Sequence, residues 1–233
     1  MLKLLSVFKL NMTYLISFLI PTLKERSSKF KSLTDKIFSQ IEASELQDKI
    51  EVISIYDNRS IPLSLKRNMM QKMCSGQYFI HMDDDDAIAD DYCITVINEI
   101  NNLRLQQQRY GKTMPDIITY DQQCLVDGST FIVKTNPNRS FALSPTGNQY
   151  DNKMKCNGLI PTYERMFWQY NLFNRKKYAH IYRTDSDSNS HEDVNWLKKI
   201  LLEYPKNFYN IDKILHYYFF DSNGVGEDAS TCQ

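Results

Sequence analysis

The stretch from Tyr78 to Asp86, YFIHMDDDD, joins a short apolar run directly to four consecutive aspartates. The run 78–82 is typical of a buried strand, and the carboxylates after it repel one another unless a positive charge lies among them. Mg²⁺ and Mn²⁺ prefer carboxylate oxygens, and alternate side chains of an extended segment point to the same side. Asp83 and Asp85 are therefore expected to face one ligand together. The pattern indicates a metal and phosphate site, with an acidic helix cap as the plainer alternative.

Strands and helices alternate on both sides of this acidic run. We expect strands at residues 14–20, 50–56, 78–82 and 116–120, and helices around Leu33, Ile37 and Ile41, around Leu65, Met69 and Met73 with Gly76 as the cap, and over 92–108. This order predicts a doubly wound α/β sheet, in which ligands bind at the carboxyl ends of the strands. Polar residues that follow a strand are thus the first site candidates, namely Thr22, Asp57 and the four aspartates.

The second half of the chain has a less regular pattern. Residues 124–133 predict a hairpin that turns at Asp127-Gly128, and residues 135–155 are polar and loop-like. Further on, we expect a helix over 194–202, a strand over 214–220 and a mobile tail. A helix is also predicted around five aromatic residues, which would form a core or groove wall: Tyr163, Phe167, Trp168, Tyr170 and Phe173.

Length and charge restrict the class of protein. The chain has 233 residues, with 28 Lys and Arg against 28 Asp and Glu, so one α/β domain with no formal net charge is expected. This balance argues against a positively charged nucleic-acid-binding surface that extends over the whole protein. Seven cations of the second half could still meet an anionic acceptor such as DNA or a phosphoglycan, or simply be solvated: Arg139, Lys153, Lys155, Arg165, Arg175, Lys176 and Lys177.

The five cysteines are scattered and include no Cys-x-x-Cys pair. A disulfide framework or a zinc knuckle is therefore not expected, and we predict a reducing compartment. No apolar run approaches the length of a membrane span, so the sequence predicts a cytoplasmic protein, bacterial or viral, without a transmembrane anchor.

Several short motifs occur in an order that is specific when taken together. They are residues 20–26 (IPTLKER), Gln40, residues 53–57 (ISIYD), Lys66-Arg67-Asn68, Gly76 before the apolar strand, the Asp83–Asp86 run, and residues 191–194 (HEDV). In this order they resemble the family 2 type of glycosyltransferases, which have the GT-A fold. The chain departs from that family where Lys24 replaces the usual Asn and where Asn58-Arg59 follows Asp57 in place of Gly-Ser.

The resemblance spans residues 14–202 and implies a fold and its division. It implies an α/β GT-A (nucleotide-diphospho-sugar transferase) fold, with a doubly wound mixed sheet and a Rossmann-like N-terminal half. Residues 1–233 would form a single domain, in which 14–121 bind a nucleotide sugar, 122–220 bind the acceptor and 221–233 form a flexible tail.

The resemblance also implies a donor, most often a uridine diphosphate sugar, and a Mn²⁺ or Mg²⁺ ion. Asp57 would accept a hydrogen bond from the base, and Asp83 would reach the ribose and help to hold the metal. Asp85 would be the direct metal ligand, although four aspartates in a row allow Asp84 or Asp86 to take its place. The remaining donor-site residues would be Thr22, Lys24, Arg26, Lys66, Arg67 and Asp84.

For catalysis the resemblance implies that Asp193 is the general base, with Glu192 as the alternative base or the holder of the acceptor. Acids also commonly decorate a helix N-terminus without further function. One base and no covalent nucleophile imply a single displacement with inversion. The acceptor hydroxyl could belong to a glycan, a protein or a hydroxylated DNA base. A nucleotidyltransferase and a non-catalytic nucleotide-sugar-binding module are the competing hypotheses.

Overall fold

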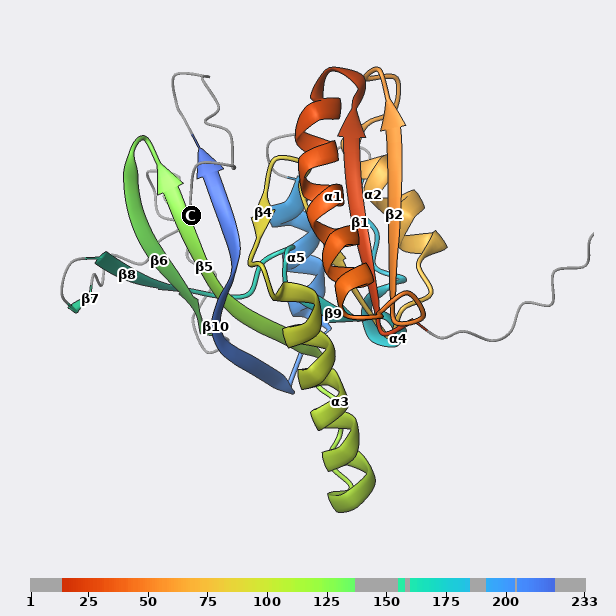
Figure 1. The fold of residues 1–233 in the computed structure, drawn as a ribbon. Helices are drawn as coiled ribbons and strands as arrows, with labels where there is room; N and C mark the ends of the chain where they lie inside the picture. The colour runs from red at the N-terminus through yellow and green to blue at the C-terminus, as the bar shows by residue number, and fades with distance from the viewer. Residues whose placement is uncertain (1–13, 137–154, 158–159, 185–191, 204, 221–233) are drawn as a thin grey trace, which may run out of the picture.

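The computed structural model describes residues 14–136, 155–157, 160–184, 192–203 and 205–220. Ten strands of these residues form one mixed sheet (Figure 1). The strands are β1 (Ile16–Leu23), β2 (Ile50–Asp57), β3 (Tyr78–His81), β4 (Ala87–Ile88), β5 (Ile117–Val126), β6 (Ser129–Thr135), β7 (Lys155–Asn157), β8 (Ile160–Arg165), β9 (Leu172–Asn174) and β10 (Phe208–Phe220). The helices are the 3-10 turn η1 (Lys24–Arg26), α1 (Ser27–Ala43), α2 (Leu63–Met73), α3 (Tyr92–Tyr110), α4 (Arg175–Tyr178) and α5 (Glu192–Leu202).

The strand order places the parallel part of the sheet at one edge. The main path is β2-β1-β3-β9-β5-β6-β8-β7, and β10 pairs with β4 and β5 off this path. Strands β2, β1 and β3 are parallel, whereas β9 runs antiparallel to both of its neighbours, β3 and β5. The carboxyl ends of β1, β2 and β3 therefore meet at one edge of the sheet, as the sequence pattern predicts.

Helices cover both faces of the parallel strands, which makes the sheet doubly wound (Figure 1). Phe18 of β1 packs on Tyr92 of α3, with ring centroids 5.6 Å apart, and α1 lies beside α3. On the opposite face, His81 of β3 packs on Trp196 of α5 at 5.3 Å, and α2 packs on β1 and β2.

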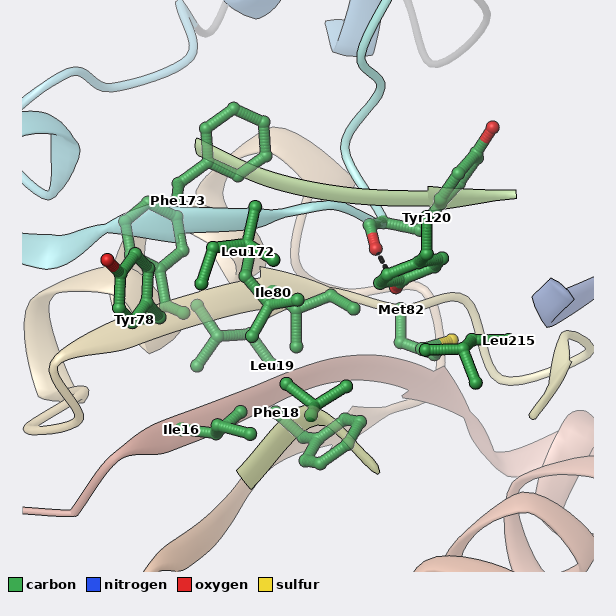
Figure 2. Close-up of a cluster of buried hydrophobic side chains, with 14 of the residues drawn as sticks. Ile16, Phe18, Leu19, Tyr78, Ile80, Met82, Tyr120, Leu172, Phe173 and Leu215 are labelled. Carbon is green, nitrogen blue, oxygen red and sulfur yellow. Dashed lines mark hydrogen bonds between the residues drawn. The ribbon is translucent and has the colours of Figure 1, made fainter. Parts of the chain in front are cut away.

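The core between these layers is built from alternating residues of the central strands. Figure 2 shows Ile16 and Phe18 of β1, Tyr78 and Ile80 of β3 and Phe173 of β9 in one cluster. All five are fully buried. Burial of such side chains stabilises the fold by about 1.5–3 kcal/mol each relative to exposure, and the rigid edge it creates positions the polar residues that follow the strands.

Helix α2 forms where its sequence predicts it, but it is buried on its polar side. Leu65, Met69 and Met73, which recur every four residues, are exposed, Met73 by 63%. The buried face carries Ser64, Lys66, Arg67, Asn68, Met70 and Gln71. Hydrophobic spacing therefore identifies the helix, but the buried face is the polar one, because its side chains bind carboxylates and carbonyl groups inside the fold.

Gly76 does not cap α2, contrary to the sequence-based prediction. The helix ends at Met73 with Cys74 in an extended conformation. A Cβ atom on Gly76 would lie 2.8 Å from the carbonyl carbon of Ile16 and 2.5 Å from Oγ of Ser17. The glycine is needed because the chain passes so close to β1 as it enters β3.

Three further predictions need correction. Strand β1 continues beyond Pro21 to Leu23. The expected strand 116–120 and the first arm of the hairpin form a single strand, β5. The hairpin turn itself is confirmed, with positive φ at Asp127 and Gly128. The predicted aromatic helix is wrong: these residues fall on β8, on β9 and in the segment between them, because pairing of β8 with β6 and of β9 with β3 and β5 places them.

Several expected segments lie outside the described residues, including most of the loop 135–155 and the tail from 221. Strand β10 begins at Phe208, six residues before the predicted strand at 214–220. None of the helices in the described part of the chain is long and apolar enough to cross a membrane.

Candidate active site

The first wall of the site is made where β1 and β2 end. Lys66 of α2 reaches back to both strands: its Nζ lies 2.6 Å from Oδ1 of Asp57 and donates to the carbonyl oxygen of Thr22 at 3.2 Å. Oδ2 of Asp57 accepts the backbone N–H of Ile61 at 2.7 Å. These contacts, with the hydrogen bond from Lys66 foremost, lower the pKa of Asp57, so the carboxylate is held ionised. Lys24 lies on η1 and is exposed.

The four aspartates alternate between buried and half-exposed positions. Asp84 and Asp86 are buried, whereas the side chains of Asp83 and Asp85 are 36% and 40% exposed. The sequence-based expectation that Asp83 and Asp85 share one side while Asp84 points elsewhere agrees with this alternation. Arg26 lies against the run, with its Nη2 2.6 Å from Asp84 and 2.5 Å from Asp85.

Asp84 is a structural carboxyl group rather than an open one. Thr22 donates its hydroxyl to Oδ2 of Asp84 at 2.7 Å, which ties β1 to the acidic loop. Burial raises the pKa of Asp84 to about 6, although Thr22 and Arg26 both act in the opposite direction. Asp84 is therefore poorly suited to bind an exchangeable ligand.

Replacing Asp84 with Asn should change how stability depends on pH. Because folding raises the pKa of Asp84 from 3.8 to about 6, the native state binds this proton more tightly, and the wild type loses stability as pH rises from about 4 to about 6. We expect Asp84→Asn to exceed the wild type in free energy of unfolding by about 1–3 kcal/mol at pH 7.5. Denaturant titrations in chelator should show the gap closing below pH 4, and an equal gap at both pH values would contradict this reading.

Asp86 anchors the other end of the acidic run. Its Oδ2 accepts the backbone N–H of Asp83 at 3.2 Å and lies 3.1 Å from Nε2 of His216 on β10. His216 is fully buried, contacts Gln122 at 2.8 Å through Nδ1 and stacks on Tyr170 with ring centroids 4.3 Å apart. His216 thus packs in the core, and its contact with Asp86 fixes the loop that presents Asp83 and Asp85.

Arg67 joins the acidic loop to the start of α5. Its Nη2 lies 2.5 Å from Oδ1 of Asp83, and its Nη1 lies 2.8 Å from Oε1 of Glu192. Burial opposes the charge of Arg67, but Asp83 and Glu192 outweigh burial and raise the pKa of the guanidinium. Gln169 completes the junction by accepting from Arg67 and donating to Oδ2 of Asp83 at 3.2 Å.

Glu192 is enclosed by two arginines. Besides Arg67, it pairs with Nε of Arg183, and the side chain of Glu192 is only 4% exposed. Arg183 lies over the ring of Trp196 at 4.3 Å, and burial lowers its pKa to about 10. Because Arg67 and Arg183 occupy its two carboxylate oxygens, the geometry favours Glu192 as a positioning residue over the alternative base.

Asp193, the predicted base, lies next to Glu192 and is half-buried. Burial raises its pKa, and nearby Glu192 adds to that shift. Its Oδ1 accepts the backbone N–H of Val194 at 2.8 Å. A carboxylate with raised proton affinity and a partly open side chain has the properties that a general base needs. His191 and residues 188–190, which precede it, lie outside the described residues.

Four residues hold this junction together through contacts that sequence reasoning missed. Gln169 bridges Arg67 and Asp83, and Arg183 clamps Glu192. Asn68 exchanges two hydrogen bonds with the backbone of Arg183, and Gln71 donates to the carbonyls of residues 178, 179 and 181. The polar residues of α2 between its apolar positions were the available signal, since polar side chains that face the sheet along a whole helix need buried partners.

The residues of the acidic loop fit a Mg²⁺ or Mn²⁺ ion bound together with phosphate. No group of three or more His, Cys, Asp or Glu side chains that could enclose a metal occurs in the described part of the chain. Mg²⁺ is commonly held by one or two carboxylates, water and substrate phosphates rather than by a protein cage. The half-exposed oxygens of Asp83 and Asp85 meet that requirement.

Comparison with solved structures identifies the fold. The crystal structure of S. aureus TarS matches with a TM-score of 0.53 and 14% identity, over 88% of this chain and 36% of that one. The chain has the GT-A fold. The fragment 1–349 of TarS in complex with UDP-GlcNAc matches with a TM-score of 0.51 and 15% identity, over 94% of this chain and 61% of that fragment. This GT-A chain thus spans about 60% of the TarS fragment, and neither a family model nor a curated protein matches its sequence.

Proposed function

We propose that this GT-A protein is a metal-dependent, inverting glycosyltransferase that moves a sugar from a nucleoside diphosphate sugar to an acceptor hydroxyl. The observation that carries the proposal is the double contact of Arg67, which binds Asp83 of the acidic loop and Glu192 beside Asp193. One buried side chain thus holds Asp83, a candidate metal ligand, near the candidate base. At such short range, both groups can act on one substrate.

The donor would bind across the ends of β1, β2 and β3. Asp57 would accept a hydrogen bond from the base, with Lys66 keeping the carboxylate ionised and in place. Thr22, Lys24 and Arg26 would line the same pocket. UDP is the favoured nucleotide, since the fold neighbour TarS has been crystallised with UDP and with UDP-GlcNAc.

Asp85 and Asp83 would hold the divalent cation, which supplies Lewis-acid stabilisation of the negative charge on the departing diphosphate. Arg67 and Gln169 fix the orientation of Asp83. Arg26, which contacts Asp85, limits how far that carboxylate can turn from the ligand.

Asp193 would take the proton of the acceptor hydroxyl while the hydroxyl oxygen forms its bond to the anomeric carbon. The bond from that carbon to the diphosphate oxygen breaks in the same step, and its electron pair leaves with the diphosphate. A single displacement of this kind inverts the anomeric centre. Glu192, held by Arg67 and Arg183, keeps the first turn of α5 and therefore Asp193 in position. A glycan, a protein or a hydroxylated nucleic-acid base could supply the hydroxyl.

A panel of nucleotide sugars, incubated with Mn²⁺ or Mg²⁺ and no acceptor, tests this proposal. Slow release of one nucleotide is expected, with loss of the signal in chelator and recovery on adding metal. Asp85→Asn should lower that rate at least 100-fold, since the ligand for the charge on the leaving group is gone. Asp90→Asn is the matched control, because the Asp90 side chain is 96% exposed. Turnover that survives both chelation and Asp85→Asn would exclude the metal-dependent mechanism.

A further inference from the structure

Arg165, the last residue of β8, lies beside the candidate active site. Its Cζ is 4.3 Å from the centre of the Trp168 ring and 5.2 Å from that of Tyr170. Tyr170 stacks on His216 with an interplanar angle of 10°, and His216 contacts Asp86. Two stacked rings therefore separate the guanidinium of Arg165 from the acidic loop.

Arg165 differs from the other buried cations of the site because no carboxylate pairs with it among the described residues. The residue is 8% exposed, and its Nη2 is buried with no hydrogen-bond partner. The other buried cations are each paired: Lys66 with Asp57, Arg67 with Asp83 and Glu192, and Arg183 with Glu192. A buried charge without an anion costs free energy that the two rings offset only in part.

We propose that Arg165 binds an oxyanion, in chemical terms a phosphate, that is carried by the acceptor substrate. This inference rests on the proposed function and names the class of acceptor. A guanidinium presents a planar fork of N–H donors that matches phosphate oxygens, and rings on its face leave its edge for that contact. Because only 8% of Arg165 is exposed, most of its hydration is already lost, so an arriving anion meets a desolvated charge.

The position of Arg165 favours the acceptor over the donor as the source of the phosphate. The donor pocket lies at the ends of β1, β2 and β3, where Arg26, Lys66 and Arg67 are found. Arg165 lies at the end of β8, beyond Tyr170 and His216 as seen from Asp86. The acceptor would thus be a phosphate-bearing molecule whose hydroxyl reaches the site while its phosphate is held by Arg165.

Binding of inorganic phosphate to protein saturated with UDP and Mg²⁺ tests the proposal. ³¹P line broadening should show phosphate binding to the wild type, with the Kd raised at least tenfold in Arg165→Met and by less in Arg165→Lys. Arg109→Met is the matched control, since Arg109 is exposed, and it should leave the Kd unchanged. The Kd for UDP should stay within twofold in all three variants.

Other outcomes would separate the sources of the anion. Competition between phosphate and UDP, with Arg165→Met weakening both alike, would assign Arg165 to the donor diphosphate and overturn the acceptor proposal. No phosphate binding by the wild type would overturn it as well. If UDP failed to bind while phosphate still bound through Arg165, the proposed function would be contradicted but the anion site would be supported.

The melting temperature distinguishes a structural role of Arg165 from anion binding, because loss of a structural residue lowers it. Arg165→Met removes a buried charge that no carboxylate of the described residues balances, so its melting temperature should equal or exceed that of the wild type. A melting temperature lower by several degrees, together with unchanged phosphate binding, would make Arg165 a packing residue and overturn the proposal.

Discussion

Asp193→Asn is expected to lower the rate of sugar transfer by roughly 10²–10⁴-fold, the range that a positioned general base contributes. The amide keeps the size of the side chain and can still accept the N–H of Val194, but it cannot take a proton from the acceptor. Because burial raises the pKa of Asp193, the transfer rate of the wild type should rise with pH as this carboxyl group ionises. The variant should lose that dependence.

Two measurements make the result for Asp193→Asn specific. The Kd for UDP should match the wild type, because Asp193 is assigned to the acceptor and not to the nucleotide. Asp90→Asn, on an exposed side chain, should keep full transfer. If Asp193→Asn retained transfer within threefold of wild type, the base would have to be sought elsewhere and Asp193 would be left as a helix-terminal acid.

Glu192→Met is expected to lower the free energy of unfolding by about 3–5 kcal/mol, the cost of breaking a buried ion pair on one side. Glu192 is the carboxylate that faces Arg183, and both side chains are at most 4% exposed. Arg67 keeps Asp83 as a second partner, so the uncompensated charge would fall on Arg183.

A double variant separates the charge effect from the loss of packing. Arg183→Met combined with Glu192→Met removes both charges and should recover most of the lost stability, since apolar residues of similar volume can replace a buried pair at little cost. Urea titrations of the wild type, both single variants and the double variant give the coupling energy. Additive losses in the double variant would contradict a direct pairing of Arg183 with Glu192.

The sequence predicts the parallel half of this protein well because each of its signals is local. Apolar runs that end in polar residues mark β1, β2 and β3, and alternation within the Asp83–Asp86 run predicts which carboxylates are open. The turn at Asp127-Gly128 is equally local, since both residues tolerate positive φ. Such features need no knowledge of distant neighbours.

The features that sequence reasoning missed depend on distant parts of the chain. Three polar residues of α2 are buried only because the fold brings them partners from other elements. Lys66 pairs with Asp57, Arg67 pairs with Glu192, and Gln71 donates to three carbonyl groups of residues 178–181. Strand β9 is three residues long and is defined by its place between β3 and β5, so no period in its own sequence could reveal it. The aromatic residues around it were misassigned to a helix for the same reason.

Equilibrium binding of UDP, measured by calorimetry with and without Mn²⁺, is the most direct test of the central claim that these strand ends form a nucleotide-sugar site. We expect UDP to bind one site, more tightly with Mn²⁺, and Asp85→Asn to remove the benefit of the metal while Asp90→Asn does not. A folded wild-type protein that binds no UDP or other nucleoside diphosphate, with or without metal, would contradict a nucleotide-sugar site at these strand ends.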